Sequence, residues 1–129
     1  MNTILVEVSV GELLDKISIL EIKKEKIKDS EKLKFINDDY EVLKNQLDKN
    51  VKSDEKIDNL FQSLKEINSK LWIIEDDKRL CEKNSDFSEK FIKLSRDVHF
   101  LNDDRGKIKL EINHHTGSKI KEIKKYTSY

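Results

Sequence analysis

Apolar residues recur at steps of three and four positions through most of the chain, which is the spacing of one buried face of an α-helix. The spacing is unbroken in a segment from residue 57 to 81 and in another from 91 to 112. The positions of the two stripes are Ile57, Leu60, Leu64, Ile67, Leu71, Ile74, Lys78 and Cys81, then Phe91, Leu94, Val98, Leu101, Arg105, Ile108 and Ile112. This heptad-like spacing predicts two long helices that pack side by side as in a coiled coil.

A third periodic segment lies nearer the N-terminus and begins at a capping box, Ser9-Val10-Gly11-Glu12. The Ser9 hydroxyl can accept a hydrogen bond from the Glu12 amide, and the Glu12 carboxylate can accept one from the Ser9 amide. The stripe continues through Leu13, Ile17, Leu20, Lys24, Ile27, Leu33 or Phe35, Ile36, Tyr40, Leu43 and Leu47. We expect one helical arm over residues 10–48, kinked near residue 29 at Asp29-Ser30. A full break there, which gives four helices, is the alternative.

The connections between the periodic segments are short and polar. Residues 49–53 predict a turn, and Asn84-Ser85 ends the second stripe. Asp86 and Glu89 have the spacing of a second capping box before the third stripe, which closes at residues 114–117. Short connections between arms of similar length predict antiparallel neighbours. The expected fold class is therefore all-α, an antiparallel bundle of three long helices.

The two ends of the chain are expected to be irregular. Residues 1–8 are mostly apolar and predict a short extended lead, and residues 118–129 form a basic tail. The length of 129 residues suits one helical domain over the whole chain, 1–129.

The composition excludes several classes of partner. Charged residues make up 40% of the chain, but 26 basic and 26 acidic residues give a net charge of +0, so no overall field attracts nucleic acid or an anionic membrane. The apolar runs are too short to span a bilayer, and residues 1–8 lack the basic start of a signal peptide. The single cysteine, Cys81, cannot form an internal disulfide, which fits a reducing compartment. We therefore expect a cytoplasmic protein.

Three cationic residues occupy apolar positions in the stripes: Lys24, Lys78 and Arg105. A charge in a dry core must be paired, reach water, or lie at a wet site. Control of helix register, a functional pocket, and exposure at a splayed end all remain open. The chain has only three arginines, Arg79, Arg96 and Arg105, in a background of lysines. An arginine there favours a site that needs a planar guanidinium, although an ordinary surface position is the alternative.

In antiparallel helices joined by a short turn, residues at equal distances from the turn lie side by side. This rule gives the positions of the three predicted helices relative to one another along the bundle axis. Lys78 falls opposite about residue 25 of the first arm and about residue 92 of the third, at 1.5 Å of rise per residue. One end of the bundle then gathers Glu21, Lys24, Glu25, Glu75, Lys78, Arg79 and Arg96, with Arg105 elsewhere. At this level Glu75 and Arg96 are expected to form an ion pair between facing helices, with Arg79 as the local competitor for Glu75.

Catalytic signals are weak. Glu12 and Asp15 have the acidic i, i+3 spacing of helical metal-dependent hydrolases, but about five such pairs are expected by chance in so acidic a chain. His114 and His115 are adjacent and diverge on a helix, so they form no metal pair. No phosphate-binding glycine loop and no cysteine cluster is present in the sequence, and we predict neither a metal nor a cofactor.

The segment Leu71-Trp72-Ile73-Ile74 is apolar on all sides of a helix. Such a segment is expected to be buried on two sides. The second cover is either the N-terminal lead or another copy of the chain, and a homodimer is the preferred interpretation.

Several segments resemble a family of short bacterial and phage proteins known only as a domain of unknown function. The matching segments are residues 9–17 (SVGELLDKI), Leu71-Trp72 with Ile74-Glu75-Asp76, Asn102-Asp103 with Arg105, Ile108-Lys109, Ile112-Asn113 and Gly117-Ser118. Gly106 stands where the family pattern has alanine. The resemblance spans nearly the whole chain and implies a complete domain from a marine bacterium or its phage. It implies no mechanism.

Two hypotheses about function follow. The first is a non-catalytic interaction or assembly module, whose partner is a second copy or another protein. The alternative is a small helical enzyme or anion-binding protein that acts on an anionic metabolite, by analogy with helical bundles that hold charged side chains inward. The anion contacts would be Lys24, Lys78 and Arg96, with Arg79 and Arg105 as further candidates, and the acid/base would be Glu21 or Glu75.

Overall fold

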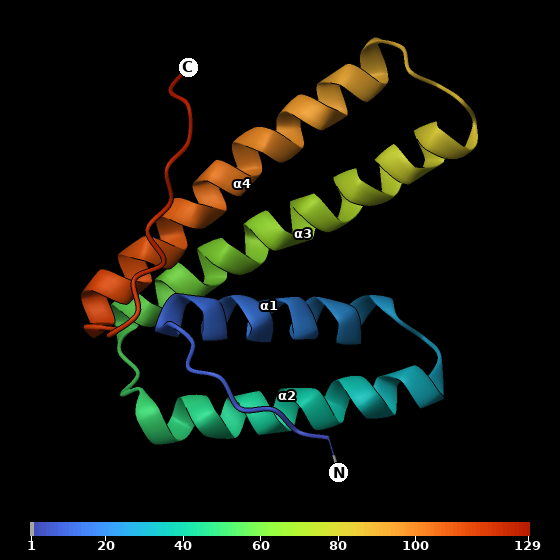
Figure 1. Ribbon diagram of the computed structural model, residues 1–129. Coiled ribbons are helices and arrows are strands. Elements are labelled where there is room, and N and C mark those ends of the chain that lie inside the picture. The colour runs from blue at the N-terminus through green and yellow to red at the C-terminus, as the bar shows by residue number, and fades with distance from the viewer. Residues whose placement is uncertain (1) are drawn as a thin grey trace.

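The computed structural model describes residues 2–129 and shows four α-helices joined by short loops (Figure 1). The helices are α1 (Val10–Lys26), α2 (Ser30–Asn50), α3 (Glu55–Lys83) and α4 (Glu89–Thr116). The described residues contain no strand. The all-α class and the four-helix alternative are therefore confirmed, and the single kinked arm over residues 10–48 is wrong.

The first arm breaks because the backbone leaves the helical conformation at residues 27–29. Ile27 ends α1 with φ −92° and ψ 130°, and Asp29 is also extended. The Asp29 carboxylate accepts hydrogen bonds from the amides of Glu31 and Lys32 at 2.9 and 3.1 Å, so Asp29 caps a new helix. The chain reverses there, and α2 packs antiparallel to α1 (Figure 1).

The helices are arranged as a hairpin with a smaller pair against its base (Figure 1). α3 and α4 form the antiparallel hairpin, and α1 packs against both of them near the start of α3 and the end of α4. α1 runs in the same general direction as α3, which differs from the expected antiparallel order because the extra reversal at residue 29 turns the chain once more. α2 packs against α1 and leaves the outer half of the hairpin uncovered.

The apolar core lies where α1, α3 and α4 meet. Leu14, Ile57, Leu64 and Ile112 form a buried cluster, and Leu47 of α2 is among the partly buried residues packed against it. Burying an aliphatic side chain of this size contributes roughly 1.5–3 kcal/mol. The core therefore fixes α1 against the base of the hairpin and sets the position of the polar residues on the neighbouring turns of α1.

The helix ends agree with the sequence in part. The Ser9 hydroxyl accepts the Glu12 amide at 3.0 Å, as expected, but the Glu12 carboxylate turns to Lys109 instead of returning to Ser9. The second expected capping box is wrong. Asp86 accepts the amide of Ser88 at 3.1 Å, and Ser88 is the residue that precedes α4.

The levels of α3 and α4 agree with the expectation from the predicted turns. The Lys78 ammonium lies 5.8 Å from the centroid of the Phe91 ring, one residue from the expected level of 92. Cys81 is buried on the same face of α3. No helix among residues 2–129 is long and apolar enough to cross a membrane.

Candidate functional site

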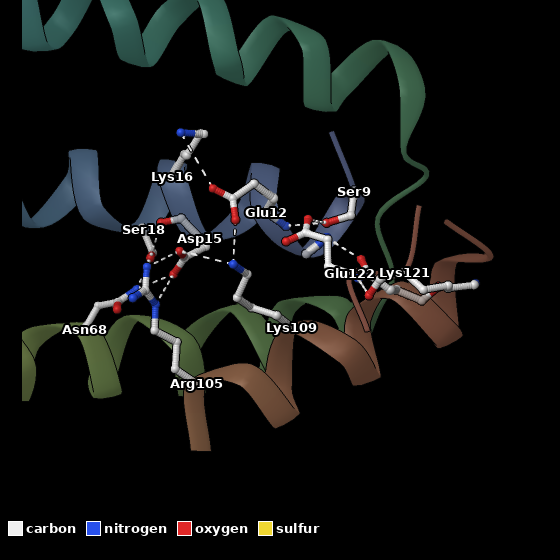
Figure 2. Close-up of polar contacts among 12 residues, drawn as sticks. Ser9, Glu12, Asp15, Lys16, Ser18, Asn68, Arg105, Lys109, Lys121 and Glu122 are labelled. Carbon is white, nitrogen blue, oxygen red and sulfur yellow. Dashed lines mark hydrogen bonds and ion pairs between the residues drawn. The ribbon is translucent and has the colours of Figure 1, made fainter. Parts of the chain in front are cut away.

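Asp15 is a charged residue in the most enclosed part of the molecule, with only 1% of its surface exposed. Arg105 of α4 holds it side-on, with Nε donating to Oδ1 at 3.0 Å and Nη2 donating to Oδ2 (Figure 2). Asn68 of α3 donates a further hydrogen bond to Oδ1 at 2.8 Å. Lys109 Nζ lies 3.8 Å from Oδ2. Asp15 therefore joins α1 to both helices of the hairpin, and its buried charge is fully paired.

A second set of contacts surrounds this carboxylate. Glu12 Oε2 accepts from Lys109 Nζ at 2.5 Å, and Glu12 Oε1 lies 3.6 Å from Lys16 Nζ. Asn68 also donates to the Ser18 hydroxyl at 2.8 Å, and that hydroxyl donates to the backbone carbonyl of Asp15 at 2.7 Å (Figure 2). Among residues 2–129, no buried side-chain nitrogen or oxygen lacks a hydrogen-bond partner.

The Arg105 guanidinium is a permanently charged, fixed group. Its hydrogen bonds with Asp15 raise the pKa of Arg105 above the ordinary value, which is already far above neutral pH. Only the Nε and Nη2 side of the guanidinium is used by Asp15. Nη1 donates to no atom of the described residues, and the side chain is 29% exposed. Arg105 thus presents a second, open edge whose orientation is set by a buried carboxylate.

The start of α1 is tied to the end of α4 by a close backbone approach. The Gly11 amide donates to Asn113 Oδ1 at 2.7 Å, and Asn113 Nδ2 donates to the Lys121 carbonyl at 3.1 Å. A Cβ atom at Gly11 would lie 2.5 Å from the backbone oxygen of Lys109, closer than real Cβ contacts. The absence of a side chain at Gly11 therefore allows α1 to reach α4, one turn from the Asp15–Arg105 pair.

A cleft of about 460 Å³ opens beside this pair, between α1, α3 and α4. Its apolar lining consists of Ile19, Ile22, Leu71 and Trp72. Its polar lining consists of Asn68, Glu75, Asp76, Arg79, Asn102 and Arg105. The volume is within the range of small-molecule sites in proteins. Several segments that carry the family resemblance, including Leu71-Trp72 and Glu75-Asp76, meet there.

The structure brings together only some of the candidate residues from the sequence. Glu75, Arg79 and Arg105 line the cleft. The Lys78 ammonium is near the Phe91 ring instead, and the Arg96 guanidinium carbon lies 5.8 Å from the Phe100 ring centroid. Glu21 and Lys24 face α2 and the first half of α3, because the reversal at residue 29 moves them away from the level of Lys78.

The expected ion pair between Glu75 and Arg96 does not form among the described residues. The two residues are at the expected level of the hairpin, but Glu75 lines the cleft beside α1 whereas Arg96 packs toward Phe100. The levels along the hairpin were predicted correctly, and the faces on which the two side chains lie were not.

Glu21 and Lys24 contribute to the packing of α2 on α1 through Tyr40. The Lys24 ammonium lies 4.0 Å from the Tyr40 ring centroid, and the Tyr40 hydroxyl donates to Glu21 Oε2 at 3.4 Å. Glu21 Oε1 also accepts from Lys65 at 3.1 Å. The two residues therefore join α1 to its neighbours and do not line the cleft.

The pKa of the Tyr40 phenol is raised above the ordinary value of 10.0 by burial against α1 and, next, by the charge of Glu21. Folding therefore favours the neutral phenol, and this contribution to stability is lost as the pH rises through the raised pKa. We expect the absorbance titration of the native protein, minus that of Tyr40→Phe, to have its midpoint above 10.0. In urea the same difference should return to the ordinary value. A native midpoint at or below that value would contradict the packing of Tyr40.

Sequence reasoning marked Arg105 but missed the residues that surround it at the centre of the site. Glu12 and Asp15 were dismissed as a chance acidic pair, and Asn68 and Lys109 were not singled out. The available signal was a polar residue on the inner face of a helix, since Asn68 lies four residues after Leu64 and three before Leu71, and Asp15 lies two turns before Ile22. Among residues 2–129, no group of three or more His, Cys, Asp or Glu side chains is placed to hold a metal ion.

Residues 4–129 match the family described as "family of unknown function (DUF6165)". No curated protein and no solved structure matches the chain.

Proposed function

The chain belongs to the family of unknown function DUF6165, and we propose that it is a non-catalytic assembly module that associates with a second copy of itself. The observation that carries this proposal is an apolar surface on the outer half of the hairpin, which we call the arm: residues 70–83 of α3 and 89–104 of α4. In the part of the chain that the structure describes, neither α1 nor α2 covers the outer end of the arm (Figure 1).

Large apolar side chains are exposed along the arm and at its tip. They are Ile73, Leu80, Phe87, Ile92 and Phe100, each between 42% and 56% exposed. A lone exposed apolar residue is ordinary on a protein surface, but several of them in one part of the molecule indicate an interaction site. Most of the stability of a helix comes from the packing of its apolar face against neighbours, and on the arm this face is only partly covered. The arm therefore gains stability when a partner packs against it.

A shallow hollow of about 390 Å³ lies within this surface. Its apolar lining is Ile73, Ile74, Phe100 and Leu101, and its charged lining is Lys70 and Asp97. Lys70 forms no ion pair among the described residues, whereas Asp97 is paired with Lys93 at 2.8 Å. The hollow thus offers an apolar floor and one open positive charge.

The N-terminal lead has the complementary chemistry. Ile4, Leu5 and Val6 are 74–90% exposed, and residues 2–9 form neither helix nor strand. The only charge in this segment is Glu7, which complements Lys70. In Figure 1 the lead runs across α2, away from the arm of its own chain. We therefore place the lead of each copy in the hollow of the other, the reciprocal arrangement that a two-fold axis requires.

The oligomeric state tests this proposal. We expect sedimentation equilibrium of the wild-type chain to give twice the monomer mass of 15.3 kDa. Ile73→Asp places a charge in the hollow and should give the monomer mass, with the helical circular dichroism unchanged because Ile73 is exposed. The matched control is Phe35→Asp, an exposed residue of α2 outside the arm, which should leave the dimer intact.

A second substitution tests how the two copies meet. Leu5→Asp should also give the monomer mass if the lead fills the hollow. A dimer that survives Leu5→Asp but not Ile73→Asp would overturn the exchange of leads. A wild-type chain that remains monomeric up to about 100 µM, where a specific interface of standard size is saturated, would overturn the assembly proposal itself.

A further inference from the structure

The tail, residues 118–129, is fixed at its root to the start of α1. The buried Ser9 hydroxyl donates to the Glu122 carboxylate, and the Ser118 hydroxyl accepts a hydrogen bond from the Val10 amide at 3.2 Å (Figure 2). Glu122 adopts a left-handed backbone conformation with φ 58°, which a residue with a side chain keeps only where its surroundings determine it. The contacts at the root therefore set the path of the residues that follow.

From this root the tail runs back on the α4 side of the molecule and reaches the arm (Figure 1). The centroid of the Tyr129 ring lies 5.6 Å from that of Phe100, with the two rings edge to face, and 5.0 Å from that of His99. The Tyr129 hydroxyl donates a hydrogen bond to the Asp103 carboxylate. Tyr129 is thus a second point of attachment, where an aromatic contact and a hydrogen bond join the tail to α4.

Phe100 belongs both to this contact and to the hollow of the arm. It lines the hollow together with Leu101, whereas Tyr129 is not among the lining residues. His99 and Asp103 are one turn apart on the side of α4 that faces away from Leu101, and Phe100 stands between the two sides. Tyr129 therefore packs against Phe100 from outside the hollow and leaves the hollow open.

The Phe100 ring needs such support because 42% of its surface is exposed. An exposed side chain changes rotamer freely, and fixing one rotamer when a partner binds costs affinity. The edge-to-face contact with Tyr129 restricts the ring before a partner arrives, and the Arg96 guanidinium carbon, 5.8 Å from the ring centroid, adds a second contact. The wall that Phe100 contributes to the hollow is therefore partly set in advance.

From these contacts we infer that Tyr129 is a positioning residue of the hollow: the tail of each copy holds its own Phe100 in place for the lead of the other copy. The inference rests on the proposed assembly and adds the tail to its binding site. The tail is long enough for this role. Seven residues from Glu122 to Tyr129 can span about 24 Å, whereas α4 rises only about 15 Å between Asp103 and Asn113 at the root.

Sedimentation equilibrium of the full-length chain measures the contribution of Tyr129 to the dimer. Tyr129→Ala removes the ring contact and should weaken each hollow about threefold, within the range of one aromatic pair. Because a two-fold dimer contains two hollows, its Kd should rise about tenfold. The matched control is Tyr126→Ala, a tail tyrosine of similar exposure that makes no ring contact within residues 2–129, and its Kd should equal that of the wild type.

A coupling test separates a positioning role from direct contact between Tyr129 and the partner. Phe100→Leu keeps an apolar wall in the hollow but leaves no ring for Tyr129 to hold. In this background Tyr129→Ala should change the Kd of the dimer by less than about twofold, because the two residues act through one contact. An equal loss in both backgrounds would show that Tyr129 touches the partner itself and would overturn the positioning role.

The monomeric variant Ile73→Asp shows whether the tail is attached within one chain. We expect nuclear Overhauser effects between the ring protons of Tyr129 and Phe100 in this variant. Their absence, or a Tyr129→Ala dimer as tight as the wild type, would overturn the inference and leave the assembly proposal standing. A wild-type chain that stays monomeric would overturn the assembly proposal, and the positioning role with it, even where the ring contact is observed.

Discussion

Replacing Asp15 with asparagine should lower the free energy of unfolding by about 3 kcal/mol, since it leaves the buried end of Arg105 without its counter-charge. The amide is nearly the same size as the carboxylate, so little packing changes. Its NH₂ group, however, would face donors from Arg105 and Asn68, which now contact acceptor oxygens at 2.8–3.0 Å. Urea unfolding followed by far-ultraviolet circular dichroism measures the loss, which is a large share of the stability of a small domain.

A matched substitution and a double-mutant cycle separate this pair from a general charge effect. Asp39→Asn changes an exposed aspartate of α2 and should alter the stability by less than about 0.5 kcal/mol. Arg105→Met leaves Asp15 buried with fewer donors and should also destabilise. In the cycle of Asp15→Asn with Arg105→Met, the double variant should lose clearly less than the sum of the single losses. Additive losses, or a cost of Asp15→Asn no larger than that of Asp39→Asn, would show that the pair is not coupled.

The pairing of α3 with α4 was predictable because each stripe keeps one phase over many turns. The steps of three and four positions from Ile57 to Cys81 fix one face of α3, and the short polar segment near residue 85 fixes the level at which α4 returns. The contact between Lys78 and Phe91 lies within one residue of that expectation. The pattern within each helix was enough to predict this pairing, because the short loop between α3 and α4 allows little sliding of one helix along the other.

The reversal after α1 was not resolved by the same reasoning. The apolar period continues through residues 27–36 without glycine or proline, so the pattern allowed either a kink or a turn. Asp29 decides the matter through two hydrogen bonds to backbone amides, which a kinked continuous helix would not leave free. The expected position of every residue in the predicted helix 10–48 relative to the other helices depended on that point. The expected neighbours of Glu21 and Lys24 were therefore wrong as well.

The site itself could not be derived from the pattern, because its residues come from three helices and contribute one or two groups each. Asp15 is informative only beside Arg105, 90 positions away. The sequence did mark Arg105, as an arginine at an apolar position in a chain whose basic residues are mostly lysine. Its side-on contact with the Asp15 carboxylate uses the planar fork of donors that lysine lacks. The sequence pattern did not show which face of α1 packs against α4, so it could not identify Asp15 as the partner of Arg105.

Because α1 lies so close to α4 at Gly11, we expect Gly11→Ala to lower the stability of the protein, although helix propensity alone would raise it. Gly11 is in the first turn of α1, where alanine would ordinarily stabilise the helix by up to about 1 kcal/mol. In this fold, a Cβ at Gly11 would lie 2.5 Å from the Lys109 carbonyl oxygen and 2.9 Å from Asn113 Oδ1. The backbone of α4 cannot rotate away, so α1 must move out and its hydrogen bond from Gly11 to Asn113 lengthens. We expect Gly11→Ala to destabilise the protein by about 3 kcal/mol, from overpacking and the weakened buried hydrogen bond together.

Gly106 provides the matched control, because it is also a helical glycine but a Cβ there would meet nothing within 4 Å. Gly106→Ala should therefore show the propensity effect alone and stabilise α4 by about 1 kcal/mol. The two substitutions add the same methyl group to helices of the same protein. The urea concentration at the midpoint of unfolding should fall for Gly11→Ala and rise for Gly106→Ala. If Gly11→Ala were stabilising too, α1 would not lie against α4 as described. The position of Asp15, one turn further along α1, would then lose its support, because the same approach brings its carboxylate to Arg105.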